Sequence, residues 1–246
     1  MAARTASKAA TAAPKLFGNK KQLSEDVAAH LRESIMAGEL RATSFIRTEH
    51  LAAELGVSAT PVREALMALQ SEGTIRWEPR RGFRVLPLSR QDVEDLFAVQ
   101  AYIAGELAAR AATLMDASDV DRLRTLQKEL EEAARAGDAE TVDAVNHEIH
   151  RSINRTSKAQ RLTSLLGIAV NYVPRNYYGK IEGWAEASSH DHDPIFHALE
   201  SGDSEAARTA MAEHIRHIGV LLVDHLENKG VFSAAESPED ATGTGS

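Results

Sequence analysis

The chain has 246 residues, enough for two modest domains, and 43% of them are hydrophobic, which is enough to build real cores. No apolar run approaches the length of a bilayer span, and no apolar core of a secretory signal is present, so we expect a cytoplasmic protein that does not enter a membrane. The absence of cysteine excludes disulfides and thiolate metal sites, so any metal must be held by nitrogen and oxygen.

The net charge of −8 is unevenly distributed. Residues 1–88 hold 13 Lys and Arg against 9 Asp and Glu, a net of +4, whereas residues 89–246 hold 15 against 27, a net of −12. A basic N-terminal part on an acidic molecule suits a protein that approaches nucleic acid with that part alone. The alternative is a chance asymmetry of solvated surface charge.

Residues 1–20 are rich in Ala, Thr, Ser and Lys without apolar periodicity, and they predict a disordered arm. A DNA backbone could be contacted by three lysines in or directly after this arm: Lys15, Lys20 and Lys21. Most such tails bind nothing specifically. From Ser24 onward, apolar residues at helical spacing predict an amphipathic helix that ends at Gly38.

Two short helices separated by a sharp turn are predicted next. The first apolar stripe begins at Leu51 and stops at Gly56, and the second runs over residues 62–69. Pro61 fits only the first turn of the second helix, and Gly73 is expected to end it. An N-cap oxygen for this helix is expected from Ser58 or Thr60.

A basic hairpin should follow the second helix. Ile75 and Trp77 alternate with polar residues, residues 78–82 form a turn, and Phe83 and Val85 alternate back. We therefore expect a helix-turn-helix with a small β-hairpin wing over residues 21–87, in which the second helix enters a major groove.

The run GVSATPVREAL, the glycine that ends the helix and the run RRGFRV resemble the winged helix-turn-helix of the GntR superfamily of bacterial transcriptional regulators. The resemblance implies that the chain binds double-stranded DNA through the start of the second helix, the Arg inside VREAL, and the wing tip. Ala59 stands where many relatives carry an Arg, which removes one expected contact. The residues expected to contact DNA are Arg47, Thr48, Ser58, Thr60, Arg63, Arg80, Arg81 and Gly82.

Nearly everything from residue 88 to residue 232 is predicted to be helical, in an all-α antiparallel bundle. Ser89 with Asp92 resembles a capping box, and further helices are expected from Ser118 to Gly137, over 142–153, over 161–172, from Pro194 to Gly202, and from Ser204 onward. Residues 175–193 read as irregular, and residues 233–246 as a disordered tail.

Three short runs in this region resemble helices of the ligand-sensing FCD-type domain of the FadR subfamily: NHEIH at 146–150, DHDPIFHALESGD at 191–203, and MAEHI at 211–215. Apolar spacing places Asn146, His150 and His214 on inward faces, with His192 just before its helix. Taken singly, each histidine is better explained as a hydrogen-bonded core residue. Three inward imidazoles together suit a divalent metal.

The resemblance implies an Asp and three His as metal ligands in many members. His150, His192 and His214 match the imidazoles, but Asn146 replaces the Asp, which weakens the ligand set and leaves zinc, nickel or manganese possible. Carboxylate effectors of the subfamily often pair with an Arg where Gln100 stands here. Arg175 could approach instead, although a solvated turn residue is the favoured interpretation.

These patterns predict a dimeric repressor that binds a near-palindromic operator and senses a small molecule. Two alternatives remain open at this point. One is a metal-dependent enzyme with an ancillary DNA-binding domain, and the other is a DNA binder whose helical body serves only for dimerisation.

Overall fold

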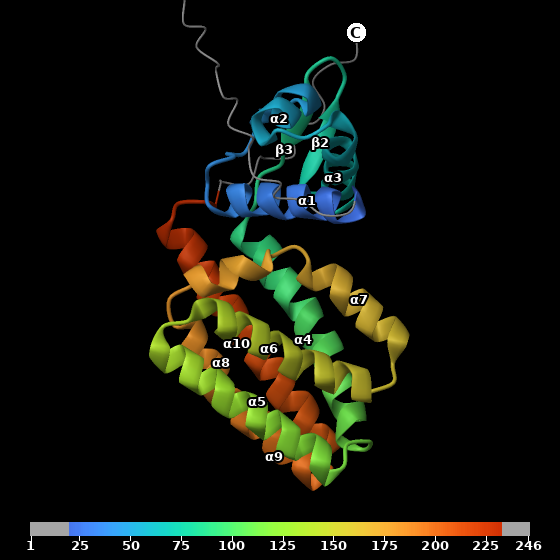
Figure 1. The fold of residues 1–246 in the computed structure, drawn as a ribbon, viewed down its shortest axis with the longest axis vertical. Helices are drawn as coiled ribbons and strands as arrows, with labels where there is room; N and C mark the ends of the chain where they lie inside the picture. Colours follow the sequence, from blue (N-terminus) through green and yellow to red (C-terminus); the bar gives the residue numbers. More distant parts are fainter. Residues whose placement is uncertain (1–19, 233–246) are drawn as a thin grey trace, which may run out of the picture.

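The computed structural model describes residues 20–232, so the predicted arm, Lys20 excepted, and the predicted tail lie outside the described residues. Figure 1 shows a small N-terminal part, here called the reader (residues 20–88), above a larger helical part, here called the body (residues 89–232). Each part has its own cluster of buried apolar side chains. The predicted combination of a winged helix-turn-helix and an all-α bundle is confirmed.

The reader consists of three helices and a small antiparallel sheet. Its elements are α1 (Lys20–Met36), β1 (Phe45–Ile46), α2 (Thr48–Leu55), α3 (Ala59–Ser71), β2 (Ile75–Glu78) and β3 (Gly82–Val85). The strand order is β1-β3-β2, with Trp77 opposite Phe83 in the hairpin. Strand β1 was not predicted, because two residues are too few to show alternation.

Two details of the reader differ from the sequence prediction. Helix α1 starts at Lys20 instead of near Ser24. Ser58 occupies the N-cap position of α3 but makes no side-chain capping hydrogen bond, and Thr60 lies inside the first turn, so neither supplies the predicted cap oxygen. Gly56 and Gly73 do have the positive φ values expected of residues that end a helix.

The body is a bundle of helices without strands among its described residues. Its elements are α4 (Arg90–Ala112), α5 (Ala117–Ala136), α6 (Ala139–Thr156), α7 (Gln160–Val170), the 3₁₀ helix η1 (Arg175–Lys180), α8 (Trp184–His190), α9 (His192–Ser201) and α10 (Ser204–Asn228). Helix α4 leaves the reader and packs along α10 through the middle of the bundle (Figure 1). The predicted capping box of Ser89 and Asp92 is formed.

Three boundaries in the body correct the sequence prediction. Helix α5 is capped by Asp116, whose carboxylate also accepts a hydrogen bond from Ser118, so Ser118 does not open the helix. Helix α9 begins at His192 instead of Pro194, because α8 and α9 follow one another with only Asp191 between them. The stretch expected to be irregular contains η1 and α8.

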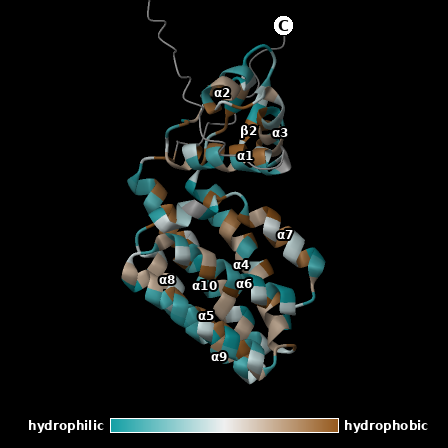
Figure 2. Cartoon of the chain, in the orientation of Figure 1, coloured by the Kyte–Doolittle hydropathy of each residue, from teal (hydrophilic) through white to brown (hydrophobic). Residues whose placement is uncertain are grey.

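The outer helices of the body are amphipathic. Figure 2 shows a mainly hydrophilic α5 with hydrophobic residues at intervals, and these residues are the buried ones: Val120, Leu123, Leu130 and Ala133. None of the helices in residues 20–232 is long and apolar enough to cross a membrane.

The close packing of α4 against α10 depends on Gly219. A Cβ atom at this position would lie 2.8 Å from Cβ of Phe97, in a buried contact. We expect Gly219→Ala to lower the free energy of unfolding by about 1–3 kcal/mol through overpacking. Gly167→Ala is the matched control, since Gly167 is helical with open space around it, and it should leave stability unchanged or raise it by about 0.5–1 kcal/mol. If Gly219→Ala is as stable as the wild-type protein in thermal unfolding, this account is wrong.

Candidate functional site

Helix α3 and the β2–β3 hairpin enclose a hollow of about 650 Å³ on the outer surface of the reader. Six of the eight residues expected to contact DNA line it, and they come from the start of α2, from α3 and from the wing: Arg47, Thr48, Arg63, Arg80, Arg81 and Gly82. Ser58 and Thr60 are exposed at the start of α3 but do not line the hollow. The fold thus gathers residues up to 35 positions apart in the sequence (47 to 82) on one surface.

The individual residues contribute unequally to this surface. The four arginines are exposed, whereas Thr48 is only 8% exposed and offers a partner the least surface. Gly82 has a φ of +104°, and a Cβ there would lie 2.5 Å from the carbonyl oxygen of Ile46, so only glycine fits the wing tip. The guanidinium of Arg81 lies 4.2 Å from the ring centre of Phe45, which helps to hold it at the rim.

A second cluster lies inside the body, where three histidines from three helices meet. His150 of α6, His192 of α9 and His214 of α10 each offer a ring nitrogen, and these nitrogens lie within 4.8 Å of one another. The Nε2 atoms of His150 and His214 are 3.2 Å apart. Residues separated by more than sixty positions in the sequence are therefore brought to one point.

Two neighbouring side chains orient these rings. Nδ1 of His192 lies 2.8 Å from Oε1 of Gln127, and Nδ1 of His214 lies 3.2 Å from a carboxylate oxygen of Asp191. Because an amide or carboxylate oxygen only accepts, the Nδ1 atoms of His192 and His214 carry the proton and donate, which leaves their Nε2 atoms unprotonated on the side of the cluster. Metal-binding histidines are commonly held in this way.

Burial favours the neutral form of two of the rings, those of His150 and His192. Burial, reinforced by the neighbouring His214 and His147, lowers the pKa of His150 to about 3. Burial, together with the facing His214 and His150, also holds the pKa of His192 well below its usual value. Burial raises the pKa of Asp191, but its hydrogen bonds with His214 and His217 outweigh this and leave the pKa lowered. Neutral imidazoles beside an ionised carboxylate are the protonation states that metal binding requires.

Nε2 of His192 is a buried atom that lacks a hydrogen-bond partner within the described part of the chain, and so is Oδ1 of Asn146. An unpaired buried donor or acceptor costs on the order of 1–3 kcal/mol, so such atoms need an explanation. Asn146 lies one turn before His150 on α6. The three imidazoles form a nitrogen ligand set of the kind that suits a divalent metal ion.

The two residues expected to bind an effector lie apart from each other. Gln100 is 2% exposed and donates a hydrogen bond to the carbonyl of Ala169, so its amide joins α4 to α7. Arg175 is exposed on η1 and forms an ion pair of 3.4 Å with Asp143 of α6. The surface position agrees with the favoured interpretation of Arg175 as a solvated residue.

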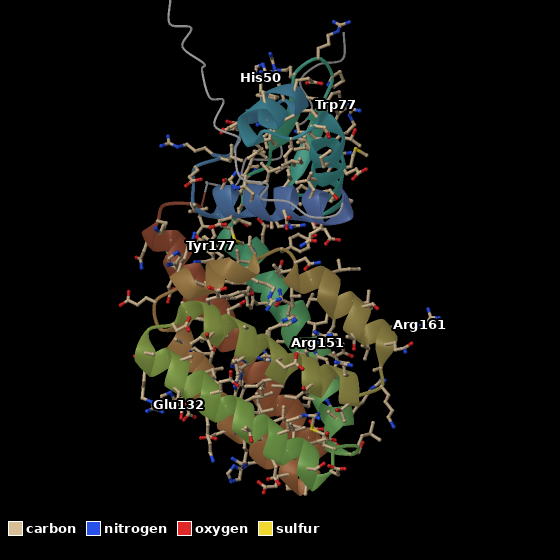
Figure 3. All side chains as sticks on the ribbon, in the orientation of Figure 1. His50, Trp77, Glu132, Arg151, Arg161 and Tyr177 are labelled. Atoms are coloured by element: carbon tan, nitrogen blue, oxygen red, sulfur yellow. The ribbon has the colours of Figure 1, made fainter. Side chains whose placement is uncertain are left out.

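The junction between reader and body is bridged by tyrosines. The hydroxyl of Tyr172 donates to the carbonyl of Glu72, the residue that ends α3, at 2.7 Å. Tyr177, labelled at the junction in Figure 3, donates to the carbonyl of Met36 at the end of α1, at 2.9 Å. A mainly apolar hollow of about 910 Å³ lies beside these contacts.

Sequence reasoning missed several residues of these sites. Gln127 lies on α5 in an otherwise ordinary helical pattern, so nothing in the sequence marks it as the partner of His192. Asp191 immediately precedes His192, and this adjacency was an available signal. Met67 and Trp77 line the hollow of the reader but lack the charge by which its arginines were identified.

Comparison with known proteins agrees with the division into reader and body. Residues 23–85 match the family described as "Bacterial regulatory proteins, gntR family", and residues 95–217 match the FCD domain. The chain is 28% identical to the "Probable D-xylose utilization operon transcriptional repressor" of Paenarthrobacter nicotinovorans, over 86% of this chain and 94% of that protein. It is 30% identical to an HTH-type transcriptional regulator of Streptomyces ambofaciens, over 78% and 82% of the two chains.

The solved structure of the Escherichia coli protein McbR matches with a TM-score of 0.62 at 24% identity, over 82% of this chain and 98% of that one. At this identity the likeness shows the fold alone. The matched relatives carry the names of transcriptional regulators, which points away from an enzyme. The sequence matches, together with the reader and body described above, lead to one conclusion: the chain belongs to the GntR family of bacterial regulatory proteins and carries an FCD domain behind its winged helix-turn-helix.

Proposed function

We propose that this regulator is a cytoplasmic, dimeric repressor that binds a near-palindromic operator through the reader and senses a small molecule at a metal site in the body. The observation that carries the proposal is the gathering of six expected DNA contacts around one hollow between α3 and the wing. A helix that enters the major groove with a wing beside it is a known way of reading duplex DNA.

The dimer and the sign of regulation rest on separate arguments. Two readers related by a twofold axis address two half-sites of a near-palindrome, which is the usual arrangement for helix-turn-helix proteins. The relative from Paenarthrobacter nicotinovorans is named as a repressor, and it matches along almost its whole length. The dimer is extended to this chain from the geometry of helix-turn-helix proteins, and the repressor role from the name of this relative.

In the body, His150, His192 and His214 would hold a divalent metal ion, with the amide oxygen of Asn146 as a further ligand. Zinc, nickel and manganese are the candidates, and the nitrogen-rich set favours zinc or nickel over manganese. When bound, such an ion supplies a Lewis-acid position for an oxygen atom of an anionic effector.

The contacts of the body suggest how occupancy of this site reaches the reader. Helix α6 carries His150 and, two turns earlier, Asp143, which pairs with Arg175 at the start of η1. The same 3₁₀ helix carries Tyr177, which contacts the end of α1. A ligand that favours one position of α6 would shift η1 and thereby the reader, provided that it binds the two states with different affinity.

Removal of Arg63 tests the DNA-reading part of the proposal. Arg63→Ala should weaken binding to the operator by about 1–3 kcal/mol and relax discrimination at one base pair, because the side chain is exposed toward the hollow on α3. The measurement is a mobility-shift titration on a duplex that the wild-type protein enriches from a randomised pool. Arg122→Ala, at an exposed position of α5 in the body, is the matched control. Unchanged operator affinity of the Arg63 variant would remove this residue from the interface.

A further inference from the structure

Two exposed side chains that line the hollow in the reader, here called its floor, are apolar, whereas four others, here called its rim, are arginines. Met67 of α3 is 54% exposed and Trp77 of β2 is 50% exposed, and both line the hollow. Figure 3 shows Trp77 at the hairpin side of the reader, away from the body. Two large apolar side chains left in contact with water on a surface built for binding indicate a partner that covers them.

Both side chains are held in place. The ring of Trp77 packs edge-on against Phe83 of the neighbouring strand, with centroids 5.0 Å apart and an interplanar angle of 63°. Met67 lies one helical turn after Arg63, so the two side chains emerge from the same face of α3. The apolar floor is therefore a fixed feature between the helix and the wing.

The rim defines the chemistry of the partner. The rim consists of Arg47, Arg63, Arg80 and Arg81, and Glu49 is the acidic side chain that also lines the hollow. A partner that fits must carry an apolar surface flanked by negative charge. A strand of DNA backbone has this pattern, because the apolar C–H surface of each deoxyribose lies between two phosphates.

The position of the floor leads to the same partner. When α3 occupies one groove and the wing lies over the adjacent one, the surface between them faces the backbone strand that separates the grooves. We propose that Met67 and Trp77 pack against the deoxyribose of that strand while the arginines of the rim bind its phosphates. The inference rests on the DNA-reading surface proposed above and adds to it an uncharged contact that carries affinity without sequence information.

Titrations of the full-length protein against two duplexes at several salt concentrations test this contact. The duplexes are one enriched by the wild-type protein from a randomised pool and one of unrelated sequence. Trp77→Ala and Met67→Ala should each weaken binding to both by the same factor, roughly three- to tenfold for the apolar area lost. The slope of log K against log salt should stay unchanged, since no charge is removed, whereas Arg81→Ala should reduce it by about one.

Control variants separate the possible outcomes. Leu114→Ala, at an exposed apolar position at the end of α4, should have no effect, and Trp77→Phe should retain most of the affinity. Because Trp77 packs on Phe83, its loss could disturb the wing. Met67, which takes no part in that ring contact, provides an independent readout, and thermal unfolding checks the fold of each variant.

Three results would contradict the proposal, and they distinguish a wrong deoxyribose contact from a wrong DNA-reading surface. If Trp77→Ala and Met67→Ala bind as tightly as wild type while Arg81→Ala binds more weakly, the deoxyribose contact is wrong and the reading surface stands. The loss of affinity in the two variants could instead be confined to the enriched duplex. If the wild-type protein then loses the same affinity when uracil replaces thymine in that duplex, the apolar side chains contact a base methyl group. If Arg63→Ala and Arg81→Ala also bind normally, the reading surface itself is wrong.

Discussion

His214→Ala is expected to abolish the stabilisation that zinc or nickel gives to the wild-type protein. His214 offers Nε2 to the cluster and contacts the rings of both other histidines, so its loss leaves two imidazoles that cannot enclose an ion. A ligand that binds only the folded state at about 100 times its Kd raises the free energy of unfolding by about 2.7 kcal/mol. The variant should lose nearly all of this increment.

The measurement is thermal unfolding with and without added metal, together with metal analysis of protein purified without a histidine tag. His197→Ala is the matched control, because His197 is exposed on α9 and lies outside the cluster. Zinc-dependent stabilisation of the same size in wild type and in His214→Ala would show that the metal binds elsewhere. An absence of any metal effect on the wild-type protein would leave the histidines a structural role only.

Gln127→Leu is expected to lower the affinity for the metal by about 10- to 100-fold, although Gln127 would not touch the ion. Its Oε1 accepts the Nδ1 proton of His192, and its Nε2 is itself held by the carbonyl of Ser189 at 2.7 Å. Leucine has a similar size but no acceptor, so His192 would be free to rotate or to carry its proton on the other nitrogen. Isothermal titration with zinc measures the change.

Gln91→Leu provides the control for the Gln127 variant. Gln91 is exposed on α4, where it donates a hydrogen bond to Asp95 on the same helix. Operator binding by the metal-free protein should be unchanged in both variants, because neither glutamine lies in the reader. If Gln127→Leu binds zinc as tightly as wild type, the hydrogen bond to His192 does not orient the ligand.

Much of the fold was predictable because apolar spacing is a local property of the sequence. The apolar residues buried on α1, α5 and α6 recur at the helical spacing from which these helices were predicted, and glycines mark several helix ends. Strand β1 was not predictable in this way, since its two residues acquire a β conformation only by pairing with β3. Capping by Asp116 instead of Ser118 shows that boundaries depend on local competition between neighbouring polar side chains.

The candidate sites show the same division. The family resemblance identified the basic residues of the reader and the three histidines, because charge and motif spacing can be read along the chain. It did not identify Gln127, whose role arises only because α5 packs beside α9, or Met67 and Trp77, which read as ordinary apolar residues of a helix and a strand. Which residues from distant parts of the sequence contact one another is decided by the packing of the helices and strands.

Enrichment of DNA from a randomised pool by the full-length protein tests the central claim most directly. The account predicts that the wild-type protein enriches a near-palindromic sequence with two half-sites, and that Arg63→Ala enriches it poorly under the same conditions. If the wild-type protein enriches no sequence, and its retention of DNA equals that of Arg63→Ala, the surface between α3 and the wing does not read DNA.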